Sequence, residues 1–400
     1  MPLSPGAPIS ELNQRIGTLQ KRMDEKKIDG AFIIQNSDLF YFAGTIQQAV
    51  LYVPLDKEPI LLVRRSMKRA QMESAISQIV PLSSPKTLYA QLIQWGYKIP
   101  KSLGMELDVL PTNLYLGYQR LFPDTKIHDI SNEIRMIRAV KSDYEIEKIH
   151  AAAQLVDQVM AKVPEYLEPG ITEIVLSAKI ESFARSLGHQ GIVRMRLFGM
   201  ELFYGHIMAG PSAAEESYLA SPTGGVSLTP AVAQGASLRS ITAHEPILVD
   251  IAFAHDGYIA DQTRIYAIGS LSEDLLFAHQ SMLALQTMLK KKIKPGVSSE
   301  EIYDLARQMA DDNGYGKYFM GSEKNAVSFV GHGIGVELDE YPFLAKGQKL
   351  KIAHNMVLAL EPKLVFPDKG VVGIENTYRV SLNGLDPLTH FSDEICQVPP

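Results

Sequence analysis

Carboxylates placed inside apolar, strand-like runs are the feature of this sequence that most limits how the chain can fold. Asp250 lies in the run ILVDI, and Asp261 lies 11 residues later in the strand-like segment 258–268. A two-residue turn at either His255–Asp256 or Asp256–Gly257 would place both aspartates on one face of a β-hairpin, because side chains alternate with a period of two. Two carboxylates on an apolar face repel each other and are poorly solvated, so a positive charge is expected between them.

A second pair of acidic residues repeats this arrangement. Glu361 ends the apolar run 356–361, and Glu375 lies in the strand-like segment 370–380. An odd-length loop centred on Asp368 would bring the two glutamates opposite each other on one face. Between the two pairs, residues 330–335 read VGHGIG, in which the glycines leave the imidazole of His332 unobstructed. The pattern therefore offers four carboxylates and one imidazole.

The chemistry of these five donors favours a metal site. Oxygen-rich ligation with a single nitrogen suits Mn²⁺, Co²⁺ or Fe²⁺, and Zn²⁺ is also compatible with it. Four carboxylates around one ion would leave excess negative charge. Two ions bridged by shared carboxylates, at the roughly 3.5–4 Å separation of two-metal hydrolytic sites, balance that charge better. The alternative is that each acid is solvated or salt-bridged and that the histidine is structural, but the repetition in two hairpins favours metal.

The pattern along the chain predicts two domains. Residues 1–132 alternate short apolar strands with helical patterns, such as the apolar stripe at residues 12, 16, 19 and 23, and this predicts an α/β domain. A long helix is predicted to begin near Glu133 and to stop at Pro169–Gly170, so residues 133–400 form the second domain. The Pro-Gly pair is followed by a capping Thr or Ser, and this motif recurs at residues 295–298. The motif either simply ends one helix and starts the next, or it marks two similar halves, each a helix pair followed by sheet.

Composition excludes several classes of function. The chain has 400 residues, of which 46% are hydrophobic, and its formal charge of −6 provides no basic surface for nucleic acid or an anionic membrane. No apolar run approaches the roughly 20 residues that span a bilayer. The first residues lack the pattern of a secretory signal, and the single Cys396 excludes an internal disulfide and a thiolate-rich metal site. We therefore expect a cytoplasmic protein without nucleic-acid or membrane partners.

Several short motifs resemble the pita-bread metallopeptidases, the superfamily of Xaa-Pro aminopeptidase, prolidase, methionine aminopeptidase and creatinase. In the first part of the chain the similar segment is DLFYFAG at residues 38–44, and the entry to the second domain is IRAVKS at residues 137–142. The most specific pieces follow in order: VD at 249–250, GYIADQTR at 257–264, GHGIG at 331–335, LEP at 360–362 and GIE at 373–375. The resemblance covers nearly the whole chain.

This resemblance implies a fold, a metal centre and a reaction. The implied fold is mixed α/β (α+β), with a creatinase-type amino-terminal α/β domain followed by a pita-bread catalytic domain that has a pseudo-twofold repeat. The implied ligands of two divalent ions, with manganese favoured, are Asp250, Asp261, His332, Glu361 and Glu375. Asp261 and Glu375 would bridge the ions. A hydroxide held between the ions would attack the carbonyl of an Xaa-Pro or short peptide substrate, and Glu361 would shuttle the proton. A homodimer is also implied.

Three positions depart from the peptidase pattern. Ser217 and Asp339 stand where the peptidases carry histidines, and Gly373 stands where they usually carry an arginine. A second hypothesis therefore stays open, a same-fold hydrolase of a small non-peptide amide or amidine-like metabolite. A third is a binding homologue without turnover, which the cost of keeping five unneeded buried donors disfavours.

Neighbouring side chains could take over the roles of the missing groups. We expect His206 to act as a second catalytic residue. The predicted substrate-binding residues are Tyr204, His206, Ser217, Asp339 and Arg196. The alternatives are that His206 is a satisfied core histidine and that the arginine pairs with structural acids.

Overall fold

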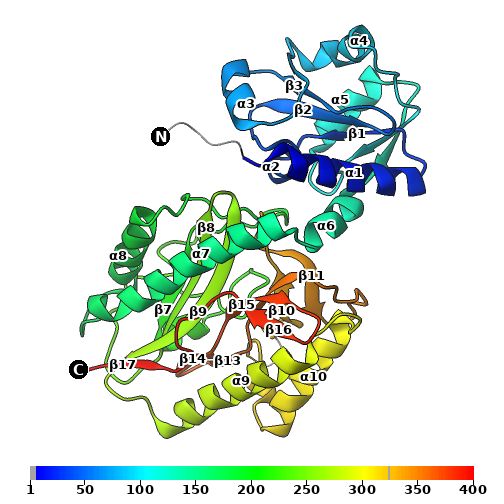
Figure 1. Cartoon of the computed structure of the whole chain (residues 1–400). Coiled ribbons are helices and arrows are strands. Elements are labelled where there is room, and N and C mark those ends of the chain that lie inside the picture. Colours follow the sequence, from blue (N-terminus) through cyan, green and yellow to red (C-terminus); the bar gives the residue numbers. More distant parts are fainter. Residues whose placement is uncertain (1–5, 323–324) are drawn as a thin grey trace. The chain divides into compact units, whose positions relative to one another are not determined.

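The computed structural model describes residues 6–322 and 325–400 and divides the chain into two compact units (Figure 1). The first unit holds the residues up to Arg138 together with residues 196–198, and the second holds residues 139–195 and 199–400. None of the helices in the described ranges is long and apolar enough to cross a membrane.

The first unit is built on one six-stranded sheet covered by helices. Its strands pair in parallel, except that β2 runs antiparallel to both β1 and β3. In spatial order the strands are β4 (Ile79–Pro81), β3 (Ile60–Val63), β2 (Ala49–Pro54), β1 (Gly30–Ile33), β5 (Ser102–Met105) and β6 (Lys126–Asp129). The helices are α1 (Ile9–Glu25), α2 (Asn36–Ala43), α3 (Met67–Glu73), α4 (Leu88–Gln94), α5 (Thr112–Leu121) and α6 (Ser131–Ala139), with the short η1 (Pro85–Thr87) before α4.

Local sequence explains most of these elements. The apolar stripe at residues 12, 16, 19 and 23 is buried on one face of α1, as its helical spacing predicts. Helix α2 is capped by Gln35, whose side chain accepts a hydrogen bond from the Asp38 amide. Gly44 ends α2 in the left-handed conformation that favours glycine.

The long helix that was predicted to begin near Glu133 is in fact two helices. Helix α6 ends at Ala139, and α7 (Asp143–Lys162) begins after a capping box formed by Ser142 and Glu145. The prediction was wrong because a serine followed three residues later by a glutamate starts a new helix rather than continuing the old one.

The second unit contains a four-stranded sheet, a five-stranded sheet and a two-stranded hairpin. The first sheet has the order β17 (Cys396–Val398), β9 (Tyr258–Ile268), β8 (Ile247–His255) and β7 (Gly205–Ala209). The second has the order β11 (Glu340–Ala345), β10 (Phe329–Gly333), β12 (Val357–Leu360), β15 (Asn376–Val380) and β16 (Leu385–Pro387). The hairpin is β13 (Lys363–Phe366) with β14 (Gly370–Gly373).

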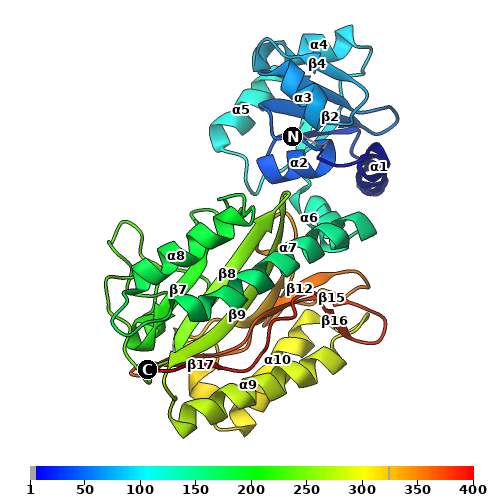
Figure 2. The same cartoon turned by 60° about the vertical axis from the view of Figure 1, so that its left-hand side comes forward.

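Two pairs of helices pack against these sheets (Figure 2). Helices α7 and α8 (Glu173–Ser186) contact strands of the first sheet, and α9 (Glu273–Lys292) and α10 (Ser299–Asp312) contact strands of the second sheet and the hairpin. The short helices are η2 (Val163–Tyr166), η3 (Gly210–Ala214) and η4 (Gly316–Tyr318).

The two halves of the second unit begin in the same way. Thr172 caps α8 and forms an antiparallel bridge with Ser240, and Ser298 caps α10 and forms an antiparallel bridge with Lys351. Of the two alternatives that the Pro-Gly segments leave open, the matching caps and bridges favour two similar halves. Asp250 and Asp261 lie on strands of the first sheet, and Glu361 and Glu375 are adjacent in sequence to strands of the second sheet.

Candidate metal centre

The β8–β9 hairpin places the first two carboxylates on one face. His255 pairs with Tyr258, so the turn is Asp256–Gly257, and both turn residues have positive φ, as a type I′ turn requires. Asp250 pairs with Thr263, and Asp261 pairs with Ala252. Because Thr263 and Asp261 are two residues apart on one strand, both aspartates point to the same side, as predicted.

The β13–β14 hairpin sets the second pair. Phe366 pairs with Gly370 across a three-residue loop centred on Asp368, and the same register continues through β12 and β15, where Leu360 pairs with Asn376. Glu361 and Glu375 are the next residues in this register and therefore lie opposite each other. This confirms the predicted geometry of the second hairpin.

His332 reaches the same place from β10. Its Nδ1 lies 3.1 Å from the Gly333 carbonyl oxygen and 3.0 Å from that of Leu338. Carbonyl oxygens only accept, so in the neutral ring Nδ1 carries the proton and Nε2 has the lone pair. Nε2 lies 3.7 Å from Glu361 Oε1 and 3.9 Å from Glu375 Oε1. The ring therefore presents the nitrogen that can bind a metal toward the glutamates.

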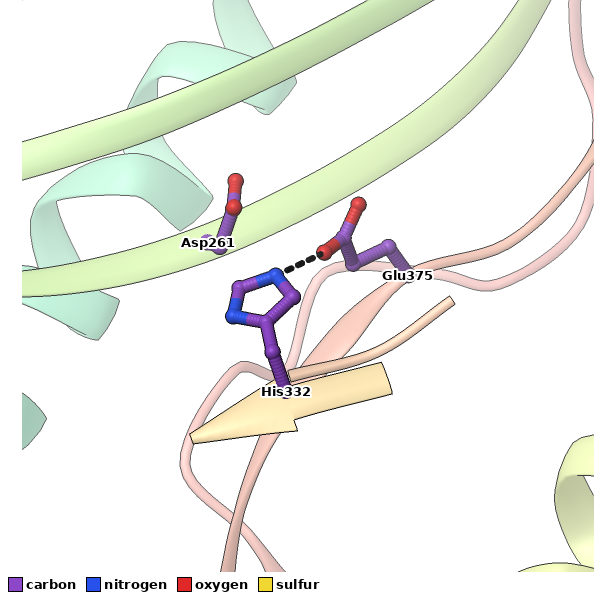
Figure 3. A group of neighbouring side chains, drawn as sticks. All are labelled: Asp261, His332 and Glu375. Carbon is purple, nitrogen blue, oxygen red and sulfur yellow. Dashed lines mark ion pairs between the residues drawn. The ribbon is translucent and has the colours of Figure 1, made fainter. Parts of the chain in front are cut away.

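Asp261, His332 and Glu375 converge on one point, as Figure 3 shows. Each is buried and offers one ligand atom, and these atoms lie within 4.8 Å of one another. Burial, then Glu375 and Asp250, raises the pKa of Asp261, and burial is also the main cause that raises the pKa of Glu375 to about 7. A cation would remove this electrostatic cost, so the three donors fit a single divalent ion.

Lys363 is a charged residue of this centre that the sequence does not predict. Its Nζ lies 2.8 Å from both Glu361 Oε2 and Glu375 Oε2, and 3.1 Å from Asp250 Oδ2. Burial alone would lower its pKa, but the three carboxylates raise it well above the ordinary value for lysine. The positive charge that the facing carboxylates predict is present, and it is an ammonium group. A signal was available, because Lys363 follows Glu361 by the two-residue period of a strand.

Two threonine hydroxyls hold residues of this centre, one through the Glu375 carboxylate and the other through the backbone of Asp261. Thr263 Oγ1 donates a hydrogen bond of 2.8 Å to Glu375 Oε2. Thr377 Oγ1 accepts from the Asp261 amide at 2.9 Å and donates to the Asp261 carbonyl oxygen at 2.8 Å. Neither threonine was singled out from the sequence, since a strand threonine is common and its partners lie more than 100 residues away.

A cavity within the second unit opens over these donors. Asp250, Asp261, His332, Glu361 and Glu375 all line it. Apolar side chains form part of its wall, namely Met195, Met200, Leu202, Leu219, Phe329 and Leu338. Such a mixture of apolar wall and converging polar groups is typical of a binding site for a small ligand.

Two of the predicted substrate-binding residues, His206 and Asp339, line this cavity. His206 pairs with Asp250 in the β7–β8 ladder, and its Nε2 lies 3.0 Å from Gln234 Oε1 while its Nδ1 lies 3.2 Å from Thr223 Oγ1. Burial lowers the pKa of His206, which favours a neutral ring. Asp339 Oδ1 lies 3.6 Å from His332 Nδ1.

The structure places the other three elsewhere. The ring of Tyr204 stacks on His189 with 4.2 Å between centroids. Ser217 is half-buried and donates its hydroxyl to the Ala233 carbonyl oxygen. Arg196 belongs to the first unit, where it pairs with both oxygens of Asp108 at 2.7 and 2.9 Å and with Asp38 at 2.8 Å. For the arginine this is the structural alternative that the sequence left open.

A unit of two halves, each with a helix pair and a sheet, that gathers buried Asp, His and Glu donors at a cavity defines a metal-dependent hydrolase of the pita-bread type. Residues 147–381 match Metallopeptidase family M24, and residues 15–140 match the Creatinase/Prolidase N-terminal domain. The chain belongs to metallopeptidase family M24. The predicted fold class, a creatinase-type α/β domain followed by a pita-bread domain, is confirmed.

Similar proteins extend over almost the whole chain. The Xaa-Pro dipeptidase of Lactobacillus delbrueckii subsp. lactis is 25% identical over 391 residues, which cover 95% of this chain and 98% of that protein. The solved structure of an Xaa-Pro dipeptidase from Bacillus anthracis has a TM-score of 0.82 at 24% identity and covers 97% of this chain and all of that one (100%). That of an X-Pro aminopeptidase from Thermotoga maritima has a TM-score of 0.80 at 22% identity, with 96% and 99% coverage.

Proposed function

We propose that this chain is a metal-dependent peptidase that acts at the amino terminus of short peptides, with Xaa-Pro peptides as the first substrates to test. The observation that carries the proposal is the convergence of Asp261, His332 and Glu375 within 4.8 Å at the wall of a cavity. Membership of family M24 and the names of the similar dipeptidases support the choice of substrate.

The three donors would hold a divalent ion, and Mn²⁺ is the first ion to test because oxygen ligands outnumber nitrogen. Such an ion supplies a polarised substrate carbonyl and lowers the pKa of bound water. Glu361 lines the cavity, and while its Oε2 accepts from Lys363, its Oε1 faces His332 and is placed to hold or pass a proton. His206 would act as a neutral hydrogen-bonding group, since burial lowers its pKa.

The charge of the cavity favours a substrate that presents an amino group. Glu201 and Asp339 line it in addition to the metal-site carboxylates, and no lysine or arginine is found among the described residues of its lining. A free carboxylate on the substrate would meet like charge here, whereas an ammonium group would be attracted. The same observation supports a second candidate, a small amide or amidine-like metabolite with a positive charge.

The decisive assay uses the Mn²⁺-loaded protein with three peptides: an Xaa-Pro dipeptide, an Xaa-Pro tripeptide and the same tripeptide with an acetylated amino terminus. We expect hydrolysis of the tripeptide with a free amine and little or none of the acetylated form. Asp261→Asn should abolish turnover, because it removes a metal ligand. Asp256→Asn is a matched control on the same hairpin, where Asp256 makes a surface salt bridge with Lys148.

Other outcomes separate the remaining hypotheses. A protein that binds metal but hydrolyses none of the peptides would contradict the peptidase proposal and favour the small-amide hydrolase. A protein that takes up no metal would favour a binding homologue without turnover.

We also propose a homodimer in the cytoplasm, on the family resemblance and on a sequence with one cysteine, Cys396. The mass of the purified protein by light scattering tests the dimer.

A further inference from the structure

The side chain of Lys363 lies inside the set of donors expected to hold two metal ions. It is 1% exposed, and its ammonium lies within 3.1 Å of oxygens from Asp250, Glu361 and Glu375. An ammonium group has three N–H donors, and here three carboxylate oxygens are available to accept them. The group is therefore fully hydrogen-bonded by residues that would otherwise bind a metal.

The two glutamates divide their oxygens between two positions. Glu361 and Glu375 each direct Oε2 toward Lys363 and Oε1 toward Nε2 of His332. One position, next to Asp250, holds the ammonium group. The other, next to His332 and Asp261, is the place where the buried donors converge. The centre thus has the layout of a two-cation site in which the chain supplies one of the cations.

We propose that Lys363 is a built-in cation that takes the place of one of the two metal ions, so that each chain binds a single divalent ion at Asp261, His332 and Glu375. This inference rests on the metal site of the proposed function and replaces the two-ion expectation drawn from the sequence. Asp250 is then a partner of Lys363 and not a metal ligand.

Three physical effects oppose the binding of a second ion while Lys363 stays in place. A metal at the position next to Asp250 would have to displace three charge-assisted hydrogen bonds, which are among the stronger ones in proteins. It would also lie within a few ångströms of the ammonium group, where two positive charges repel strongly in a poorly hydrated interior. In addition, Lys363 neutralises part of the carboxylate charge that two metal ions would otherwise be needed to balance.

The test is a count of Mn²⁺ per chain, measured by equilibrium dialysis and elemental analysis on the full-length protein, without reference to activity. We expect one ion in the wild-type protein and none in Asp261→Asn. Lys363→Ala clears the position next to Asp250 and should raise the count to two. Lys141→Ala is the matched control, because Lys141 is another buried lysine in this unit that pairs with one carboxylate, Glu340, at 3.0 Å; its count should stay at one.

A further variant keeps the inference testable where Lys363→Ala does not fold. Asp250→Asn leaves Lys363 with two carboxylate partners and should still bind one ion, whereas a site that uses Asp250 as a ligand would lose an ion. Two ions in the wild-type protein, an unchanged count in a folded Lys363→Ala, a reduced count in Asp250→Asn, or a wild-type protein without metal would each overturn the inference.

The count also separates this inference from the proposed function. One ion per chain without hydrolysis of any peptide would support Lys363 as the built-in cation and contradict the peptidase proposal. Two ions per chain together with hydrolysis would support the peptidase and contradict the built-in cation.

Discussion

Lys363 and Gly373 lie directly opposite each other in the β13–β14 ladder. Gly373 has a φ of +151°, and a Cβ added to it would lie 2.7 Å from the Cα of Lys363 and 2.5 Å from the carbonyl oxygen of Pro362. Gly373 occupies the position at which the resemblance implies an arginine. The positive side chain here is that of Lys363, on the opposite strand.

Gly373→Ala should destabilise the protein, because the close neighbours of the new Cβ are backbone atoms that have little room to move. We expect a loss of about 1–3 kcal/mol in the free energy of unfolding, measured by denaturant titration. Gly117→Ala is the control. Gly117 lies in α5, where an added Cβ would have nothing within 4 Å, so this substitution should increase the free energy of unfolding. Equal stability of Gly373→Ala and the wild type would contradict the packing described here.

Lys363→Met should destabilise the metal-free protein by about 3–5 kcal/mol, because it leaves buried carboxylates without their partner. The control is Lys369→Met in the loop of the same hairpin, where the lysine pairs with Asp274 at the surface; its effect should stay below about 1 kcal/mol. Thermal unfolding in the presence of a chelator measures both. Similar losses in the two variants would show that the buried ammonium does not hold the carboxylates together.

The stability of the first unit should fall as the pH rises from about 5 to 8. Glu106 is buried and accepts hydrogen bonds from the amides of Ile34 and Gln35 at 3.0 and 3.2 Å. Burial, followed by the charge of Asp38, raises the pKa of Glu106 to about 8. Because this folded pKa lies above the unfolded value of about 4.3, the stabilising contribution is complete below pH ~4 and is lost as the pH rises through about 8.

Glu106→Gln keeps an acceptor oxygen and removes the charge, so it should flatten this pH dependence and stabilise the first unit at pH 8. Denaturant titrations at pH 5 and pH 8 provide the measurement. Glu25→Gln, at an exposed position on α1, is the control and should leave the pH dependence unchanged. Parallel pH profiles of Glu106→Gln and the wild type would refute the prediction.

His206→Ala should lower kcat/KM by about 100-fold, the usual cost of removing one preorganised hydrogen-bonding group from an active site. The Mn²⁺ content should not change, because His206 contacts Thr223 and Gln234 and is not among the converging donors. Steady-state kinetics and elemental analysis together make the test. His279→Ala is the control, since His279 is a buried histidine that bonds to the Asp393 carbonyl oxygen outside the cavity. A loss of metal in His206→Ala would refute the assigned role.

The register of both hairpins can be predicted from the sequence, because it depends only on the position of the turn and on the two-residue side-chain period of a strand. A turn with two positive-φ residues at Asp256–Gly257 and a loop centred on Asp368 are enough to decide which acids share a face. The side-chain period of a strand also places Lys363 beside Glu361, but a pattern of metal ligands does not indicate a lysine, because an ammonium group has no lone pair to offer an ion. The repulsion between buried carboxylates predicts a positive charge among them, but it does not tell whether that charge is a metal ion or an ammonium group.

The remaining differences come from partners that lie far away in the sequence. Arg196 is separated from Asp38 by 158 residues and from Asp108 by 88, so no local pattern indicates that it belongs to the first unit. The break between α6 and α7, in contrast, has a local signal in the sequence, the capping box formed by Ser142 and Glu145.

A cation that is part of the polypeptide cannot be dialysed away, diluted or captured by a competing protein. Because Lys363 holds Asp250, Glu361 and Glu375 from the moment the chain folds, half of the centre is assembled before any ion arrives, and metal starvation should leave the protein folded with its remaining donors already in position.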